Sequence, residues 1–438
     1  MPEQLTVYWA GEIVGHLSPQ RRGRVRFRYD EQWLEKYHQA ISFSLPCGPK
    51  EFGAEISGNF FENLLPESGV YEEICRKHRI EQGDIYNFLR FYGLDCAGAL
   101  TIVDAASPPV AEACGSENGY REITGELERL LARQNIALLA ATGARLSIAG
   151  AQDKLPVRAM ASGKEDSPLL FIPAEGSSAP TTDILKPQSS RFPDLHKNEA
   201  LCMALAKATG LAVPDSHIIH VGVYQAYLVA RFDRLQMPTG MVIRLHQEDF
   251  CQALGHGRGG KYEEHGGPGF NACSKLLLHP AIIDVELARN SFIHCAIFNF
   301  IIGNCDAHGK NFALLHHASG GVSLAPFYDL VSTMAYPELD QKFAMAIGKT
   351  FRFDRIAEHS WRQFGADMNI HPAKLSAMMR ETSEAVRENA EAIAVLHEGK
   401  YGPSPIYPAL LRVITNGIVQ TMRMADALAA NPKPKTSK

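Results

Sequence analysis

Several sequence features from which a function is commonly predicted are absent from this chain. No C-x-x-C pair occurs among its nine cysteines and no clustered zinc ligands are present, so we expect reduced, mostly buried thiols. The most apolar helical stretch, 292–302, is roughly half the length that spans a bilayer, which predicts a buried core helix and no membrane partner. The first residues lack the basic start and apolar run of a signal peptide, so we expect a cytoplasmic protein.

The chain also lacks a large excess of positive or negative charge. The chain has 44 Lys and Arg against 48 Asp and Glu, a net charge of −4, whereas proteins that mainly grip DNA are usually basic. A Walker A motif is absent as well. With 438 residues and 45% hydrophobic content, the chain is expected to be globular and to form two or three units.

The order of the expected elements predicts an α+β fold. Residues 1–105 alternate like strands at both ends around a helical middle, and a Pro-, Ser- and Gly-rich stretch at 105–120 follows as a linker. Residues 106–235 are strand-rich with one helix, 236–430 are mainly helical, and 431–438 form a basic tail that we expect to be disordered. A β lobe followed by an α lobe is typical of a bilobed, protein-kinase-like fold with a small N-terminal β-rich subdomain.

The segment GNCDAHGKNF (303–312) carries the strongest chemical pattern. Asp306 and Asn311 are five residues apart, as in kinase catalytic loops, where Asp orients the substrate hydroxyl and Asn binds Mg²⁺. His308 is a candidate contact to the loop or the γ-phosphate. Eighteen residues after Asn311, Tyr328 and Asp329 follow a strand-like stretch, where kinases place a second metal-binding Asp. Each segment alone could be an ordinary polar turn or helix cap, but their order favours phosphoryl transfer.

Other segments could hold a nucleotide. Lys186 lies on a short expected strand and Glu199 on the next helix, a pairing that clamps ATP phosphates in kinases, although two solvated charges are the simpler reading. Small residues at 149–151 permit a close backbone approach to phosphate, or form a plain turn. The glycine-rich stretch 255–270 is either a mobile loop near the site or a surface loop.

Taken together, these segments resemble the HipA-type serine/threonine kinases, the toxins of bacterial HipBA toxin–antitoxin modules. The resemblance runs from about residue 5 to residue 425. Its main segments are Ser147 to Lys154, Asp306 to Phe312 and Pro326 to Asp329, with support from residues 230–234, 245–249 and 266–269.

The resemblance implies roles for particular residues, and a core related to lipid-kinase catalytic lobes. It implies autophosphorylation of Ser147, Asp306 as the base, Mg²⁺ ligation by Asn311 and Asp329, and Lys186 as the ATP lysine. The implied phosphate loop is Ala149, Gly150, Ala151, Gln152, Asp153 and Lys154. The other implied ATP contacts are Glu199, a hinge of Ala230, Arg231 and Phe232, and His308, Lys310 and Tyr328. Ala230 departs from the acidic residue of the family prototype.

The resemblance also implies partners. It suggests ATP and Mg²⁺ as cofactors, a bacterial cytoplasmic location, and a small HipB-like helix-turn-helix antitoxin through which DNA is contacted. An aminoacyl-tRNA synthetase, such as glutamyl-tRNA synthetase, is the implied protein substrate. Two alternatives remain at this point: a catalytically weak partner or co-repressor of the antitoxin, and a kinase for a small molecule or lipid.

Overall fold

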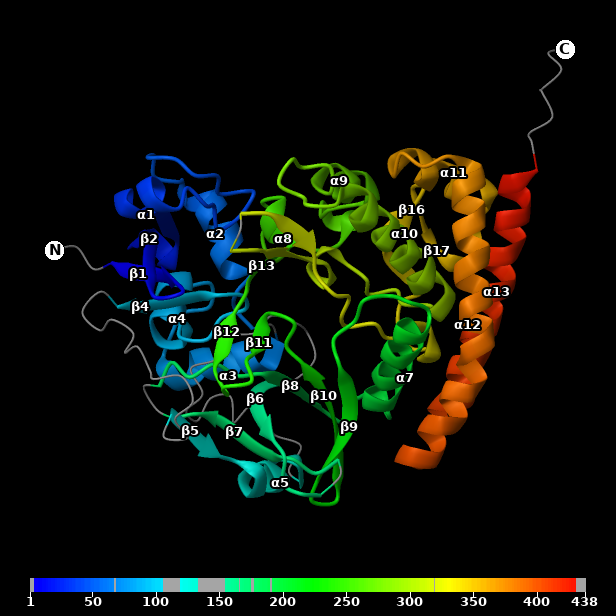
Figure 1. Ribbon diagram of the computed structural model, residues 1–438, viewed down its shortest axis with the longest axis horizontal. Coiled ribbons are helices and arrows are strands. Elements are labelled where there is room, and N and C mark those ends of the chain that lie inside the picture. Colours follow the sequence, from blue (N-terminus) through cyan, green and yellow to red (C-terminus); the bar gives the residue numbers. More distant parts are fainter. Residues whose placement is uncertain are drawn as a thin grey trace, which may run out of the picture. The chain divides into compact units, whose positions relative to one another are not determined.

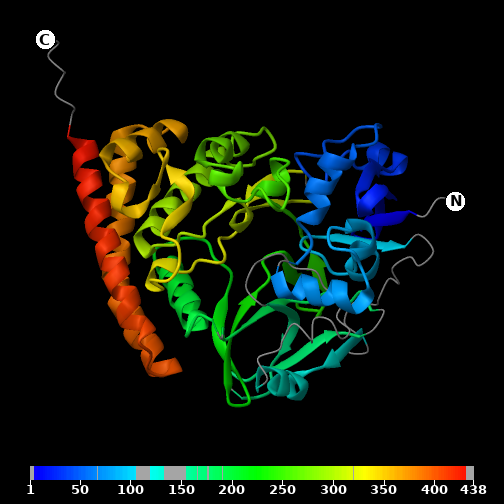
Figure 2. The ribbon, with the colours of Figure 1, turned by 180° about the vertical axis from the view of Figure 1, so that it is seen from behind.

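The computed structural model shown in Figures 1 and 2 describes residues 4–66, 68–104, 119–132, 154–164, 166–174, 177–189, 191–318 and 320–430. The chain divides into two compact units. The first contains residues 1–196, 214–259 and 313–325, and the second contains 197–213, 260–312 and 326–438. Most of the predicted linker at 105–120 (residues 105–118), Ser147, the phosphate-loop positions 149–153 and the tail 431–438 lie outside the described residues.

The first unit opens with a four-stranded antiparallel sheet in the order β3-β2-β1-β4. Its elements are β1 (Leu5–Trp9), β2 (Glu12–Pro19), η1 (Arg21–Gly23), β3 (Val25–Tyr29), α1 (Glu31–Lys36), α2 (Ala54–Glu62), α3 (Ser68–His78), α4 (Ile85–Tyr92) and β4 (Leu100–Asp104). The predicted turn between β1 and β2 has positive φ at both Ala10 (51°) and Gly11 (84°), as a tight two-residue hairpin requires. In β3 the alternation predicted from sequence is confirmed, because Val25, Phe27 and Tyr29 are buried while the residues between them are exposed.

A six-stranded sheet follows, in the order β5-β7-β6-β8-β10-β9. Its elements are β5 (Tyr120–Glu122), α5 (Thr124–Ala132), β6 (Leu155–Met160), β7 (Leu169–Pro173), β8 (Asp183–Pro187), β9 (Ser216–Val221) and β10 (Tyr224–Ala230). Leu155, Leu185 and Leu228 lie opposite one another on neighbouring strands and share one core with Leu127 of α5. Because successive side chains of a strand point to opposite faces, Lys186 lies on the face away from this core row.

Two small antiparallel sheets complete the first unit. Their elements are β11 (Arg234–Gln236), β12 (Val242–Arg244), β13 (His246–Asp249), α8 (Phe250–Ala253), β14 (Ala313–His316) and β15 (Val322–Leu324). The chain leaves this unit after residue 259 and returns about fifty residues later with β14, which pairs with β13 from His246 opposite His316 to Asp249 opposite Ala313.

The second unit is mainly helical. Its elements are most of α7 (Leu195–Ala208), η3 (Glu263–His265), α9 (Phe270–Leu276), α10 (Val285–Ile302), η4 (Gly309–Asn311), η5 (Thr333–Ala335), β16 (Lys342–Ile347), β17 (Thr350–Arg352), η6 (Phe353–Arg355), α11 (Glu358–Asp367), α12 (Pro372–Tyr401) and α13 (Ile406–Ala429). The two long helices α12 and α13 run side by side and α10 packs against both (Figure 1).

Helix α10 is the buried core helix that its composition predicts. Every residue from Phe292 to Ile302 is buried except His294, which is partly exposed. Nowhere in the described part of the chain is a helix both long and apolar enough to cross a membrane. Helices and sheets thus occur together as the α+β prediction requires, and the end of α10 delivers the chain to the candidate catalytic loop.

Candidate active site

The candidate catalytic loop begins where α10 ends, at Gly303. This glycine has a left-handed backbone (φ 66°), and its N–H bonds back to the carbonyls of Asn299 and Phe300. A Cβ at this position would lie 2.8 Å from the Cβ of Met334 and 2.9 Å from Cγ1 of Val413. The helix therefore stops at a residue that tolerates both the conformation and the close approach, which fixes where the loop starts.

Buried hydrogen bonds then hold the first part of the loop. The side-chain amide of Asn304 donates to Asn299 Oδ1 (2.9 Å), and Asn304 Oδ1 accepts from the N–H of Asp306 (3.2 Å). The N–H of Cys305 donates to Thr333 Oγ1 (2.8 Å). Asn304 is fully buried, so these bonds are shielded from water and hold the backbone on which Asp306 sits.

The candidate catalytic side chains lie along the next six residues. Asp306 and Asn311 are half-buried, whereas His308 and Lys310 are buried. The N–H of His308 donates to the carbonyl of Asp306 (2.8 Å), and the N–H of Asn311 donates to the carbonyl of His308 (2.9 Å). One tight backbone turn thus brings together the four residues predicted for this loop.

The second metal-ligand candidate lies next to this loop. The phenol of Tyr328 donates to the carbonyl of Lys310 (2.7 Å), which joins the segment of Asp329 to the segment of Asn311 inside one unit. Asp329 is half-buried and has a left-handed backbone (φ 54°), a conformation uncommon outside glycine and frequent at functional sites. The predicted pair of segments is therefore adjacent in space as well as ordered in sequence.

Helix α7 is also tied to this part of the second unit. The side chain of Asn198 donates to the carbonyl of Ser332 (2.9 Å) and accepts from the N–H of Ser332 (2.9 Å). Glu199, the next residue, is buried. The two bonds link the helix that carries Glu199 to a residue three positions after Asp329. Lys186 belongs to the first unit, so its pairing with Glu199 stays a prediction.

The first unit contributes a cationic face of the six-stranded sheet. Lys186 lies opposite Tyr227 of β10, with its ammonium 5.9 Å from the tyrosine ring centre. The pairing of Leu155 with Leu185 places Lys154 opposite Lys186 on the same face, because the strands are antiparallel. Both lysines are buried. Lysine ammonium groups are suited to bind phosphate oxygens, and the strand register puts these two lysines on the same face.

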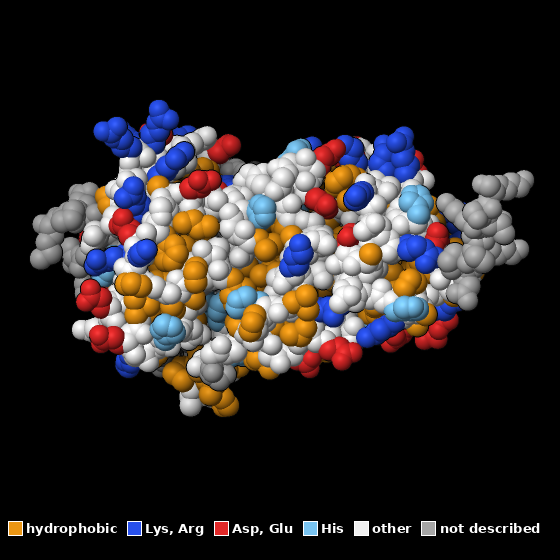
Figure 3. Space-filling model, turned by 90° about the horizontal axis from the view of Figure 1, so that it is seen from above, with side chains coloured by type: hydrophobic (Ala, Val, Ile, Leu, Met, Phe, Trp, Pro, Cys, Tyr) orange, Lys and Arg blue, Asp and Glu red, His pale blue; other side chains and the backbone are white. Residues whose placement is uncertain are grey.

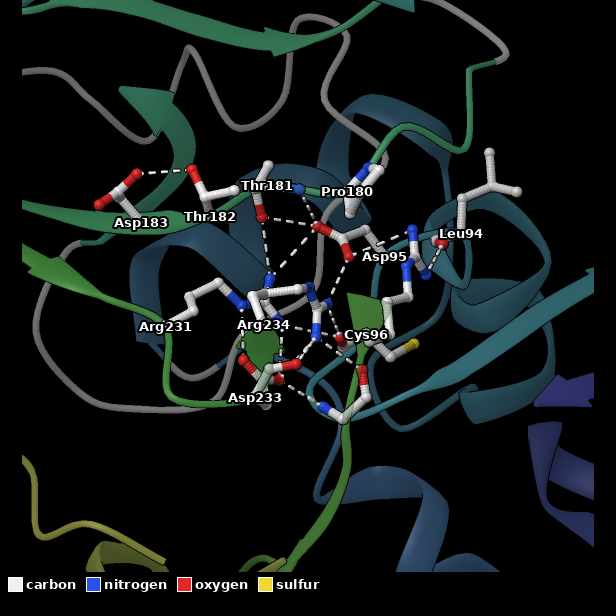
Figure 4. Close-up of polar contacts among 12 residues, drawn as sticks. Leu94, Asp95, Cys96, Pro180, Thr181, Thr182, Asp183, Arg231, Asp233 and Arg234 are labelled. Atoms are coloured by element: carbon white, nitrogen blue, oxygen red, sulfur yellow. Dashed lines mark hydrogen bonds and ion pairs between the residues drawn. The ribbon is translucent and has the colours of Figure 1, made fainter. Parts of the chain in front are cut away.

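The predicted hinge residues follow β10. The N–H of Ala230 donates to the carbonyl of Asp215 (2.8 Å), and the N–H of Arg231 donates to the carbonyl of Thr182 (2.9 Å). The Arg231 side chain is buried in an ion-pair network (Figure 4). The carbonyl of Arg231 accepts from the N–H of Arg234 (3.2 Å), so the side chain, the N–H and the carbonyl of Arg231 all have partners within the first unit.

This network surrounds two carboxylates with three guanidinium groups. Asp95 lies 3.2 Å from Arg231 Nη1, 2.7 Å from Arg234 Nη2 and 3.4 Å from Arg244 Nη2. Asp233 lies 2.9 Å from both Arg231 Nη2 and Arg234 Nη1. Burial raises the pKa of Asp95, but the three arginines more than offset it, so the net pKa falls below its usual range. Asp95 therefore stays ionised and connects the segment after α4 to the segment after the hinge.

The charges on the surface shown in Figure 3 are mixed. Lysine and arginine side chains occur there among aspartate and glutamate side chains, interspersed with apolar ones. On that face there is no single broad field of positive charge of the kind that grips a nucleic-acid backbone.

The oxygen atoms of Asn311 and Asp329 suit Mg²⁺, which prefers oxygen ligands. Within the described residues, no three His, Cys, Asp or Glu side chains gather into a metal-binding group. A kinase magnesium site does not require such a group, since substrate phosphates and water supply the remaining ligands. The donor set of this unit therefore fits the predicted cofactor.

One residue near the site escaped the sequence interpretation. The phenol of Tyr262 donates to Asp306 Oδ1 at 2.6 Å, and its ring lies edge-on to His308 with 5.2 Å between ring centres. Its only signal in the sequence was its place in the glycine-rich stretch 255–270. That stretch therefore reaches the catalytic loop.

Two family models match the chain. The "HipA N-terminal domain" matches residues 5–103, and the "HipA-like C-terminal domain" matches residues 146–390, more than half of the chain. The chain belongs to the HipA family. This confirms the family predicted from the motifs.

Individual relatives of this HipA-family chain support the same family assignment. It is 36% identical over 398 residues to "Putative kinase Y4mE" of Sinorhizobium fredii, covering 89% of this chain and 91% of that one. It is 32% identical over 379 residues to "Serine/threonine-protein kinase toxin HipA" of Shewanella oneidensis, covering 82% and 83%. A solved complex of HipA, HipB and operator DNA from Shewanella oneidensis MR-1 contains a chain that matches with a TM-score of 0.76, 26% identity and 97% coverage of both chains. The kinase-like α+β fold is thereby confirmed, and the chain is an enzyme of the HipA-type serine/threonine kinases.

Proposed function

We propose that this HipA-family chain transfers the γ-phosphate of ATP to a serine hydroxyl of a protein, as the toxin of a toxin–antitoxin module. The observation that carries the proposal is the bond from Tyr328 to the carbonyl of Lys310. It links the segment of Asp329 to the segment of Asn311, which supports the arrangement of metal ligands and base that phosphoryl transfer needs.

Each side chain has a separate task in the transfer. Asp306 accepts the hydroxyl proton of the substrate serine as the serine oxygen bonds to the γ-phosphorus. The bond between that phosphorus and the bridging oxygen of ADP breaks, and ADP leaves with the electron pair. Asn311 and Asp329 would hold Mg²⁺, which neutralises charge on the phosphates when bound. His308 and Lys310 lie in the same loop and would contact the phosphates.

The remaining nucleotide contacts belong to the same proposal. Lys186 would bind the α- and β-phosphates and Glu199 would orient that lysine, while Lys154 extends the cationic face. Ala230, Arg231 and Phe232 would contact adenine, although the N–H groups of the first two already donate to Asp215 and Thr182. Residues 149–154 would form the phosphate loop, and Ser147 would be autophosphorylated.

The proposed partners follow from the relatives. The Shewanella oneidensis structure contains HipB and operator DNA together with HipA. We therefore infer a HipB-like helix-turn-helix antitoxin that brings this chain to DNA in the bacterial cytoplasm. An aminoacyl-tRNA synthetase, such as glutamyl-tRNA synthetase, is the proposed substrate.

The test is mass spectrometry after incubation with Mg-ATP, starting from protein shown to be unphosphorylated. Wild type should gain phosphate (about 80 Da by atomic mass) at Ser147, and Asp306→Ala should gain none, because removing the base slows transfer by about 10²–10⁴-fold. Asp354→Ala is the matched control, since Asp354 is an exposed carboxylate of the same unit. A wild type that phosphorylates neither itself nor a synthetase would refute the proposal and favour a co-repressor role.

A further inference from the structure

The segment from Gly260 to Gly269 forms a closed loop against the catalytic loop. The carbonyl of Lys261 accepts from the N–H of Gly309 (3.3 Å), and the carbonyl of Tyr262 accepts from the N–H groups of His265 (3.0 Å) and Gly267 (2.9 Å). These backbone bonds define a tight turn immediately beside residue 262.

Acidic side chains fasten the same loop to the β16–β17 hairpin of the second unit. Glu263 Oε2 accepts from the N–H of Ala346 (2.6 Å), and Glu264 Oε1 lies 2.9 Å from the ammonium of Lys342. Burial raises the pKa of Glu263. The segment is therefore anchored to the hairpin through two consecutive residues of the turn.

The glycines of this segment are there for close packing. A Cβ at Gly267 would lie 2.5 Å from the carbonyl oxygen of Gly260 and 2.8 Å from that of Tyr262. A Cβ at Gly269 would lie 2.4 Å from the carboxyl carbon of Glu263. Such distances leave no room for a side chain, so these two glycines allow the loop to close tightly.

The closed loop presents the phenol of Tyr262 to Asp306. The hydrogen bond to Oδ1 is 2.6 Å long, and the ring is held edge-on against His308. A carboxylate attached by one single bond can rotate, and a charged hydrogen bond to one of its oxygens limits that rotation. The other oxygen, Oδ2, then has a fixed direction.

We propose that Tyr262 is a positioning residue for the base, an inference that rests on the proposed function. Tyr262 holds Oδ1 of Asp306 so that Oδ2 receives the proton of the substrate serine. The anchored turn fixes the position of the Tyr262 ring, and the phenol of Tyr262 fixes the orientation of the Asp306 carboxylate. Preorganisation of this kind lowers the barrier to transfer without changing how ATP binds.

The decisive variant is Tyr262→Phe, which removes the hydroxyl and keeps the ring against His308. Phosphorylation of a protein substrate should show kcat lowered by about 10–100-fold, the usual effect of losing a hydrogen bond to a charged group. The KM for ATP should stay within about twofold. Asp354→Asn is the matched control, because it breaks an exposed ion pair of the same unit (63% exposed at Asp354) outside the anchored loop and should keep kcat within about twofold.

A double-mutant cycle separates positioning from a general effect on the loop. In the Asp306→Ala background, Tyr262→Phe should change the residual rate by less than about twofold, because the group that it positions is gone. Equal kcat for wild type and Tyr262→Phe would overturn the inference. A faster Tyr262→Phe enzyme, an equal loss in Asp354→Asn, or a full loss in the Asp306→Ala background would do so too. An inactive wild type would instead refute the proposed function.

Discussion

Replacing Asp95 with asparagine should destabilise the first unit strongly. The substitution keeps the size of the side chain and removes the carboxylate that the buried Arg231 and Arg234 (Figure 4) share with the partly buried Arg244. Asp233 would be the remaining carboxylate of the network for Arg231 and Arg234. Removing one member of a buried ion-pair network costs about 3–5 kcal/mol, because the other charges stay buried without compensation.

The measurement is thermal unfolding at pH 7 followed by circular dichroism. For a unit of about 250 residues, each kcal/mol shifts the midpoint by ~2 °C, so Asp95→Asn should lower it by about 6–10 °C. Glu51→Gln is the matched control, because Glu51 makes an exposed ion pair with Arg26 worth at most about 1 kcal/mol. Equal midpoints for these two variants would refute the account of the network.

The pH dependence gives a second readout of the same variant. The pKa of Asp95 is lowered in the folded state, so its contribution is complete above the unfolded value of about 4 and is lost as pH falls below it. The stability difference between wild type and Asp95→Asn should therefore be constant from pH 7 to pH 5 and shrink below about pH 4. A difference that grows on acidification would contradict the assigned direction.

Burial, with the neighbouring His316, lowers the pKa of His246 to about 3. As pH falls, the imidazole of His246 is protonated in the unfolded chain before it is protonated in the folded protein. The free energy of unfolding of wild type should therefore fall by about 1.4 kcal/mol per pH unit below pH 6.5, and urea unfolding of His246→Gln should lack this contribution. Gly303→Ala should lower stability by roughly 1–3 kcal/mol, because its Cβ meets Met334; an unchanged urea midpoint would contradict the assigned packing. Tyr328→Phe loses the bond to the Lys310 carbonyl, so the kcat of phosphate transfer should fall by about tenfold while the circular dichroism spectrum stays unchanged. A normal kcat would show that this bond does not contribute to catalysis.

Local patterns in the sequence were sufficient for the parts of the fold that depend on local chemistry. The alternation of β3 and the turn at Ala10 and Gly11 follow from side-chain period and backbone preference. The order of Asp306, Asn311 and Asp329 predicted a shared site, and the structure joins their segments. The hairpin of β16 and β17 was not predicted, because a short run of buried apolar residues has no period that separates strand from helix.

The features that sequence could not supply come from contacts between distant residues. Tyr262 and Asp306 are 44 positions apart, and Asp95 and Arg231 are 136 positions apart. Neither Tyr262 nor Asp95 lies in a recognised motif. A single hydroxyl or carboxylate in a sequence is usually a surface group, so nothing distinguishes these two residues before the fold is known. The role of Arg231 shows the same limit, because sequence placed it at the hinge while its side chain turned out to lie in the network.

The interleaving of the two units has a consequence for how the protein is made. Strand β13 is synthesised by residue 249, but its neighbour β14 begins only at residue 313, after the intervening segment of the second unit. At translation rates of about 5–20 residues per second, β13 waits roughly 3–13 s for that neighbour. During this interval one edge of a strand is open to pairing with other chains, which is an aggregation hazard. A fragment that ends before residue 313 would keep that edge open permanently. We therefore expect that the first unit can complete its fold only after the ribosome has synthesised β14.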